Sequence, residues 1–339
     1  MLNYESILIV VSYILILNFF FNKYDFIKDR NNSYIHKKFI KNKNRLPFSG
    51  GIFLLLTIYL FFSGDFLFNF LLFLIFLIGY SSDINYLKSP NIRFYVQALL
   101  VVLLVISTES YIQSIRIDFI DNLLPIFIFK LFFTTFCILI LINGTNFLDG
   151  VNTLVIGYYL LILFFISKIF FDINSNIELS FLYIFIFTLI TLFVLNCFNL
   201  LMLGDNGSYI ISIFVGLYLI DLANENILIS PYYIMNLLWY PAYENLFSIL
   251  RKTLTKKSPL SPDNLHLHQL IYLFIKDRNI SVKYVNSITG IIINIYNFIV
   301  FYYASNNYSN TKYQILLTLL SIIIYNFLYI FLKSKIKKY

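Results

Sequence analysis

Long apolar runs repeat along the chain and constrain its fold more than any other feature. Each run approaches the roughly 20 residues that a helix needs to cross a bilayer, and short polar stretches separate consecutive runs. The chain is 59% hydrophobic and 12% charged, with a mean hydropathy of +0.78, whereas soluble domains are about 25% charged. We therefore predict an all-α, polytopic membrane protein, a helical bundle and not a barrel of alternating strands. About 10–11 spans are expected, at 6–21, 50–62, 66–81, 94–108, 124–142, 154–171, 180–197, 209–222, 227–249, 284–303 and 313–332.

The distribution of lysine and arginine predicts how these spans are oriented. The first run has no basic region before it and no small-residue cleavage signal, so we interpret it as a retained span with its amino end outside. Eleven crossings then place 21 of the 25 Lys and Arg residues on the inner side, with the carboxyl end in the cytoplasm, which is the positive-inside pattern. We expect the basic segments to meet anionic membrane lipid, so the net charge of +8 does not indicate nucleic acid. The inner segments of this single membrane-embedded domain, 1–339, are expected at 22–49, 82–93, 143–153, 198–208 and 250–283, followed by the tail 333–339.

The stretch LINGTNFLDG (141–150) ends the fifth apolar run with three regularly spaced polar side chains. If the helix continues through this stretch, Asn143, Asn146 and Asp149 lie within about a third of a turn of one another, because three residues advance a helix by roughly 300°. These side chains can therefore face a common ligand at the cytoplasmic end of the span.

Other polar stretches fall on the same predicted side of the membrane. Asp83 ends the third span, Asp205 lies in GDNGS just before the eighth, and Asp263 lies in the large inner loop. Taken singly, GDNGS also suits an ordinary capped helix start, and LDG suits an ordinary helix end. Their gathering on one face, in a chain with only seventeen acidic residues, indicates a shared site.

The acidic and amide groups suit a hard cation that holds phosphates. Magnesium takes oxygen ligands, and one or two carboxylates together with substrate phosphates usually suffice. We assign Asp205 and the amide oxygen of Asn146 as its protein ligands, with Mn²⁺ as an alternative ion. Gly204 and Gly207 let the backbone approach a pyrophosphate closely, and a helix that begins near Ser208 favours negative charge there.

His266 and His268 are two residues apart, so on a single α-helix they would point about 200° away from each other. Prolines just upstream favour an extended or looped stretch in which the two side chains converge. Zinc is the alternative ligand, but no cysteine or further histidine is near in the sequence. We expect the imidazoles to donate to phosphate oxygens, with electrostatic support from Arg251, Lys252 and Lys256.

With these stretches in view, the chain resembles the polyprenyl-phosphate N-acetylhexosamine-1-phosphate transferases of glycosyl transferase family 4, relatives of phospho-MurNAc-pentapeptide transferase. The separated HLH and the preceding SPD resemble the branch that initiates O-antigen, not the peptidoglycan enzyme. The signatures occur in the family's order: P-x-x-G-G at 47–51, N-x-x-N-x-x-D-G at 143–150, G-D-x-G-S at 204–208 and S-P-x-x-x-D-x-x-H-x-H at 258–268.

The resemblance implies transfer of an N-acetylated sugar 1-phosphate from a UDP-sugar such as UDP-GlcNAc to polyprenyl (undecaprenyl) phosphate. UMP leaves, and the lipid-diphosphate sugar starts a cell-surface glycan such as O-antigen, common antigen or teichoic acid. The implied location is a bacterial inner membrane with the active site in the cytoplasm, and a homodimer is one possible assembly. The resemblance implies catalytic roles for Asp83, Asp149, His266 and His268, and substrate contacts by Asn143, Gly204, Gly207, Ser208, Arg251 and Asp263.

The chain departs from the family at the end of the third span. Relatives usually carry adjacent aspartates there, whereas this chain has Ser82 before Asp83. A serine hydroxyl cannot replace a carboxylate as a base at neutral pH, so Asp83 is our candidate base. In the ninth span, Glu244 follows Pro241 at about the distance where relatives have an aspartate.

The alternative function is a transporter or polymerase of the same lipid-linked glycan pathway. An external polymerase site is expected in a large outer loop, but the longest one, about 109–123, has no glycine-rich or histidine motif. A transporter is expected to bury charges at mid-span, and apart from Lys130 and Lys168 the spans carry almost none. The sequence favours the transferase.

Overall fold

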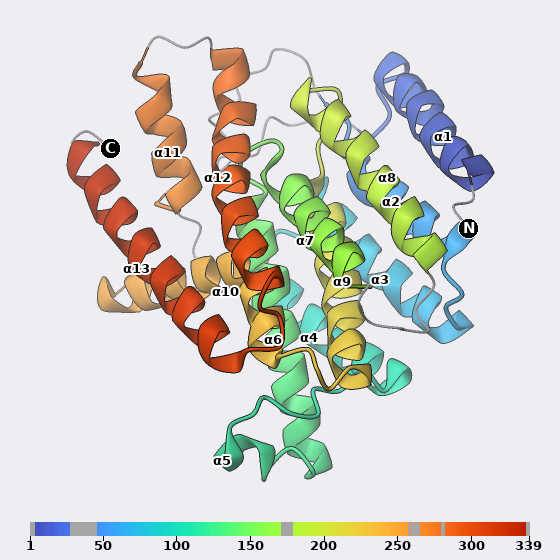
Figure 1. The fold of residues 1–339 in the computed structure, drawn as a ribbon. Coiled ribbons are helices and arrows are strands. Elements are labelled where there is room, and N and C mark those ends of the chain that lie inside the picture. Colours follow the sequence, from blue (N-terminus) through green and yellow to red (C-terminus); the bar gives the residue numbers. More distant parts are fainter. Residues whose placement is uncertain are drawn as a thin grey trace.

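The computed structural model describes residues 4–27, 46–170, 179–256, 258, 265–278 and 282–336 as a bundle of thirteen helices (Figure 1). The helices are α1 (Tyr4–Lys23), α2 (Gly50–Phe61), α3 (Phe66–Asp83), α4 (Pro90–Thr108), α5 (Asp118–Asp121), α6 (Phe127–Leu148), α7 (Leu154–Phe170), α8 (Leu179–Cys197), α9 (Gly204–Glu225), α10 (Pro231–Leu254), α11 (Leu267–Lys276), α12 (Val282–Ser305) and α13 (Thr311–Lys335).

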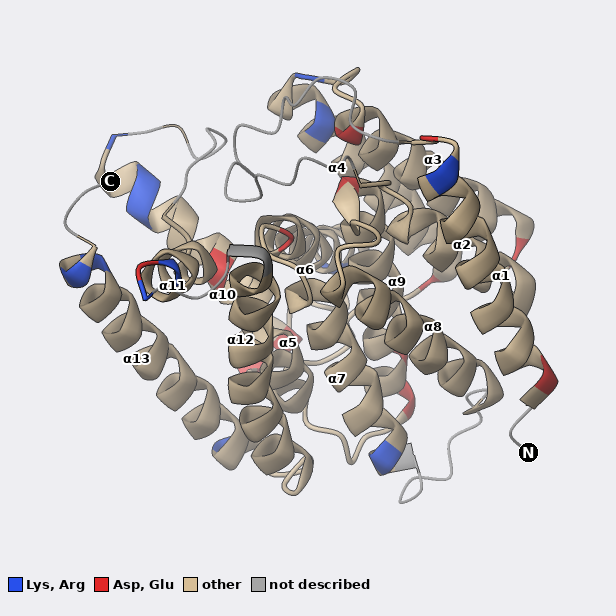
Figure 2. Ribbon diagram, turned by 90° about the horizontal axis from the view of Figure 1, so that it is seen from above, with Lys and Arg blue, Asp and Glu red and all other residues tan. Residues whose placement is uncertain are grey.

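The predicted all-α membrane bundle is confirmed, since each of the eleven expected spans coincides with one helix. Within the described residues, eight helices are long and apolar enough to cross a membrane, and α2 and the apolar part of α7 are shorter. The remaining span, α10, is more polar because it carries Glu244, Arg251 and Lys252. Charged residues lie mainly near helix ends, and most of the ribbon is uncharged (Figure 2).

The helix α9 is the centre of the bundle and packs against α2, α3 and α6. Its apolar window is 83% buried, compared with 17% for α1 and 28% for α13. A helix buried on all sides has no water to satisfy its first backbone N–H groups, so these groups need partners from the protein. The polar start of α9 therefore lies in the interior, where neighbouring helices reach it.

A proline inside α10 removes one backbone hydrogen bond from this helix. Pro241 has no N–H to donate to the carbonyl of Leu237, four residues earlier. The hydroxyl of Tyr158, on α7, donates to that carbonyl instead at 2.8 Å. The freed carbonyl is thus satisfied by a side chain, and the helix continues toward Glu244.

The short helix α11, which the sequence analysis did not predict, lies at the end of the bundle opposite α5 (Figure 1). Its residues pack against α12 and α13. Chain direction alternates through the bundle, so the ends of α3 and α6 and the start of α9 all lie at one end. Side-chain contacts join these three elements there, and they build the candidate site.

Candidate active site

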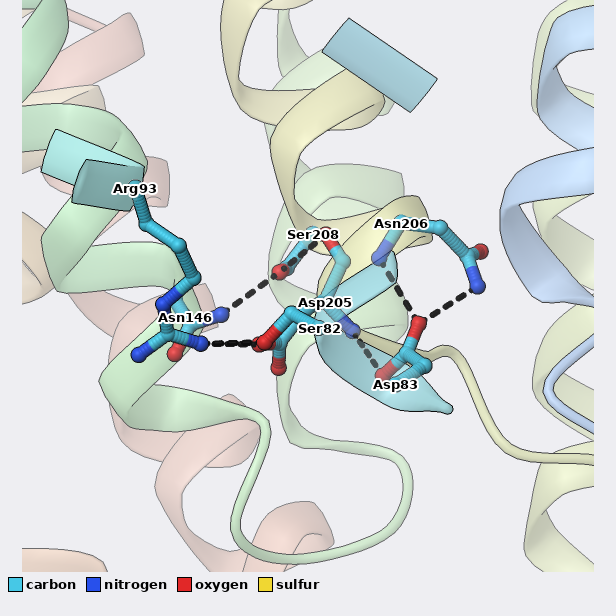
Figure 3. Close-up of polar contacts among 7 residues, drawn as sticks. All are labelled: Ser82, Asp83, Arg93, Asn146, Asp205, Asn206 and Ser208. Atoms are coloured by element: carbon cyan, nitrogen blue, oxygen red, sulfur yellow. Dashed lines mark hydrogen bonds and ion pairs between the residues drawn. The ribbon is translucent and has the colours of Figure 1, made fainter. Parts of the chain in front are cut away.

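Asp83, the last residue of α3, caps the start of α9. Its Oδ1 accepts from the backbone N–H of Asp205 at 2.9 Å, and its Oδ2 accepts from the N–H and the side-chain amide of Asn206 at 3.0 and 2.6 Å (Figure 3). Asp83 is fully buried. A carboxylate at this position satisfies two of the helix's first N–H groups and complements the positive end of its dipole.

Gly204 makes this cap sterically possible. Its φ is +76°, a left-handed conformation that side chains with a Cβ disfavour. A Cβ on Gly204 would also lie 2.7 Å from Oδ2 of Asp83. The expected helix start near Ser208 is therefore wrong: α9 begins at Gly204, because a carboxylate distant in the sequence holds the first turn.

The P-x-x-G-G segment holds the same turn from the other side. The Met202 N–H donates to the carbonyl of Pro47 at 2.9 Å, and the Gly50 N–H donates to the carbonyl of Met202 at 3.2 Å. The amide oxygen of Asn206 accepts from the N–H of Gly51 at 3.0 Å. Asn206 thus ties the start of α9 to both α2 and α3, a role the sequence analysis did not assign.

The carboxylate of Asp205 faces a serine and an arginine. Its Oδ2 accepts from the hydroxyl of Ser82 at 2.6 Å and from Nη1 of Arg93, on α4, at 3.1 Å. Arg93 also donates to the hydroxyl of Ser82 (Figure 3). The side chain of Asp205 is 10% exposed and that of Arg93 is 27% exposed, so this ion pair lies at the edge of the interior. Sequence reasoning missed Arg93, although it is one of only two basic residues in the 82–93 segment.

The end of α6 reaches the start of α9 through Asn146. Its side-chain amide donates to the hydroxyl of Ser208 at 3.4 Å, and that hydroxyl donates to the backbone carbonyl of Asp205 at 3.1 Å. The helix continues to Leu148, as the expected spacing requires, and Asp149 follows it directly. The side chain of Asn143 donates to the carbonyl of Leu139, within α6.

The two histidines lie together, as expected for a looped stretch. His266 has an extended backbone and α11 begins at the next residue, so the two rings stack with centroids 5.6 Å apart. The side-chain oxygen of Gln269 accepts from the His266 N–H at 3.1 Å, which stabilises this helix start. The ring of His266 also contacts that of Phe147, on α6, at 5.1 Å.

The environments of the two rings differ. Nδ1 of His266 lies 2.9 Å from Oε1 of Glu244, an acid to which sequence reasoning assigned no role. Both ring nitrogens of His268 are buried without a hydrogen-bond partner among the described residues, and a Cβ on Gly150 would lie 2.7 Å from its Nε2. Burial, and secondarily the adjacent His266, lower the pKa of His268 to about 3. His268 is therefore neutral at physiological pH.

The structure describes only one of the two remaining predicted site residues, Arg251. Arg251 lies in the last turn of α10, where its Nη2 donates to the hydroxyl of Ser248 at 3.3 Å. Asp263 lies outside the described residues.

The donor set suits a magnesium ion that relies on its substrate. Asp205 offers a carboxylate and Asn146 an amide oxygen, and the Ser208 hydroxyl links the Asn146 amide to the backbone of Asp205. Magnesium often takes only one or two protein ligands. Within the described ranges, no group of three or more His, Cys, Asp and Glu residues is arranged to hold a metal. Substrate phosphates and water would have to supply the other ligands, and the ion would compete with Arg93 for Asp205.

The sequence model of glycosyl transferase family 4 matches residues 66–223. This segment runs from the start of α3 almost to the end of α9, so it contains Asp83, Arg93, Asn146 and Asp205. The match covers just under half of the chain, and it shows that this part of the chain is similar to glycosyl transferase family 4. A comparison with curated proteins gives no significant match.

Proposed function

We propose that this protein transfers an N-acetylated sugar 1-phosphate from a UDP-sugar to polyprenyl phosphate, with release of UMP. One observation carries the proposal: adjacent residues at the end of α6 contact two separate polar clusters. Asn146 contacts Ser208 beside Asp205, and Phe147 contacts His266. The carboxylate, amide and imidazole groups thus gather at one end of a membrane bundle, where a soluble nucleotide and a lipid phosphate can both reach them.

Asp205 and Asn146 would hold Mg²⁺ (or Mn²⁺), which would neutralise charge on the diphosphate. The guanidinium of Arg93 adds a second positive group at the same carboxylate. His266 holds the nucleotide diphosphate or the departing UMP, with Arg251 and Asp263 in supporting contacts. The same role was expected for His268, but both of its ring nitrogens are buried and its ring packs against His266, so it supports that ring instead of contacting the nucleotide. Asn143 and Ser208 are further candidate substrate contacts. Gly207 was expected to let a pyrophosphate approach the backbone, but it packs against Leu203 and Gly51, since a Cβ there would lie 2.4 Å from Cδ1 of Leu203 and 3.0 Å from the Gly51 nitrogen.

The acceptor phosphate needs orientation more than a strong base. The second pKa of a phosphate monoester is near 6, so much of it is already dianionic at neutral pH. Both oxygens of Asp83 accept hydrogen bonds from α9, which favours a positioning role for this residue. Asp149, which directly follows α6, is the other candidate to orient or deprotonate the lipid phosphate.

The outer loop does not resemble a polymerase site in the part of the chain that the structure describes. Arg116 donates to the hydroxyl of Thr311 and to the carbonyls of Ile227 and Ile229. Asp121 accepts from Ser114 and from two backbone N–H groups of its own loop. These charged groups hold the loop together, which favours the transferase over the alternative.

The direct test is to incubate membranes with labelled UDP-GlcNAc and undecaprenyl phosphate and to measure UMP release and lipid-linked product. We expect Asp205→Asn to abolish both. The matched control is Asp221→Asn, which changes a carboxylate on the same helix about 24 Å further along, at 1.5 Å per residue. Wild-type membranes that release no UMP with any UDP-N-acetylhexosamine would contradict the proposed reaction, and an active Asp205→Asn variant would remove the metal assignment.

A further inference from the structure

Glu244 is a carboxylate buried in the protein, only 1% exposed. Its Oε1 lies 2.9 Å from Nδ1 of His266 and accepts from the backbone N–H of Leu267 at 3.4 Å. Its Oε2 accepts from the hydroxyl of Tyr325, on α13, at 2.9 Å. Residues from α10, α11 and α13 therefore meet at one acid.

Burying a carboxylate destabilises the folded protein unless hydrogen bonds satisfy its oxygens. Here both oxygens are satisfied, and one donor comes from α13, a helix that also bonds to α10 through Gln314, Thr318 and Asn326. Aromatic rings pack around Tyr325: the ring centroids of Tyr243 and Phe247 lie 4.9 and 5.4 Å from the ring centroid of Tyr325. This shell fixes the position of Tyr325, and through it the position of Glu244.

An ionised carboxylate only accepts hydrogen bonds. The ring nitrogen that faces it must then carry a proton, and in proteins the partner of one imidazole nitrogen decides which nitrogen is protonated. We propose that Glu244 and Tyr325 are a positioning pair that keeps the proton of His266 on Nδ1 and leaves Nε2 to face the substrate. The inference deepens the proposed function and rests on it for the identity of that substrate.

The neighbouring ring shows that this arrangement is selective. His268 stacks on His266, yet neither of its nitrogens has a partner among the described residues. The acid therefore distinguishes two histidines that look equivalent in the sequence. His266 has a fixed tautomer and orientation, whereas His268 is a neutral ring held by packing.

The inference also gives a function to helices outside the segment that matches the family model. That segment ends at residue 223, and Glu244, His266 and Tyr325 all follow it. Tyr325 makes the last helix, α13, part of the site.

The chain has only three histidines, His36, His266 and His268, so nitrogen NMR of ¹⁵N-histidine-labelled protein in nanodiscs can resolve each ring. Single substitutions of His36 and His268 assign the signals. We expect His266 to be protonated on Nδ1 in the wild type, and Glu244→Met to shift it toward the Nε2-protonated tautomer common in free histidine. A wild-type His266 protonated only on Nε2, or a tautomer unchanged by Glu244→Met, would overturn the inference. The wild-type spectrum decides the tautomer even if the variant does not fold.

Kinetics supply a second, independent readout. We expect Tyr325→Phe to lower kcat/KM for the UDP-sugar by about tenfold or more, as is common when the outer partner of a functional histidine is removed. The matched control is Tyr329→Phe, which removes a hydroxyl one turn further along α13 from a ring that stacks on Tyr325, and we expect it to keep full activity. Equal losses in the two variants would show that the cluster acts only through packing. Absence of wild-type turnover would refute the proposed reaction while leaving the NMR result to stand.

Discussion

Replacing Asp83 with asparagine separates two roles for this carboxylate, holding the start of α9 and acting as a base. The side chain accepts three hydrogen bonds from Asp205 and Asn206. Asparagine has one acceptor oxygen, so its amide NH₂ would face a donor of α9. At least one bond to a charged group is lost, and a donor is left buried without a partner.

The expected cost follows from these contacts. Hydrogen bonds to charged groups contribute about 1.5–3 kcal/mol each, and an unsatisfied buried donor costs about 1–3 kcal/mol. A loss of about 3 kcal/mol in ordering the first turn of α9 would weaken UDP-sugar binding by roughly 100-fold, at 1.4 kcal/mol per tenfold. The positioning role thus predicts a loss of affinity together with a loss of stability.

Two measurements test this prediction on purified Asp83→Asn protein. Calorimetry with UDP-GlcNAc and Mg²⁺ gives the affinity, and thermal unfolding in detergent gives the stability. We expect both to fall. Gly204→Ala should act in the same direction, because its Cβ would lie 2.7 Å from Oδ2 of Asp83 at a φ of +76°. Unchanged affinity and unfolding temperature with turnover abolished would refute the reasoning and identify Asp83 as a base.

Two further predictions concern the charges of the site. Ser82→Asp places a carboxylate beside Arg93 and should release Asp205 for the metal. We therefore expect half-maximal activity at a roughly tenfold lower Mg²⁺ concentration, which corresponds to about 1–2 kcal/mol for a partly exposed charge. An unchanged Mg²⁺ dependence would show that this position is dispensable. The pKa of His268 is lowered to about 3, so the unfolded chain binds a proton that the folded chain does not, and stability should fall as pH falls from about 6.5 toward 3. At pH 5 this loss is about 2 kcal/mol of unfolding free energy. It is measured by comparing the unfolding of His268→Gln and wild-type protein at pH 7.5 and pH 5. An equal pH dependence of stability in the two proteins would contradict a buried neutral ring.

The spans were predictable because a bilayer crossing requires a long apolar run, and each run became one helix. The helices α5 and α11 were not predicted because they are too short to span and their formation depends on contacts. The prolines before His266 predicted an extended or looped stretch, and the backbone of His266 is extended, but His268 lies in α11. That the two rings converge on one ligand stays a prediction. In each case the signal is local in the sequence.

The missed features depend on contacts between distant residues. The start of α9 was placed too late because its cap, Asp83, lies 122 residues from Asp205 along the chain. In the sequence alone, Arg93 looks like an ordinary loop arginine, and only the folded structure shows that it contacts Asp205. Glu244 carried a usable signal, since a lone acid in an apolar span rarely lacks a role, but its partner Tyr325 is one of 28 tyrosines in the chain and nothing local distinguishes it.

The cap on α9 explains how the chain accommodates serine at position 82. The two neighbouring residues have different roles: Asp83 accepts from the first N–H groups of α9, whereas the Ser82 hydroxyl contacts the carboxylate of Asp205 and the guanidinium of Arg93. The cap on α9 therefore does not depend on the side chain at position 82. Substitutions at position 82 would change how tightly the protein binds a cation, whereas substitutions at position 83, the next residue, would weaken the start of α9.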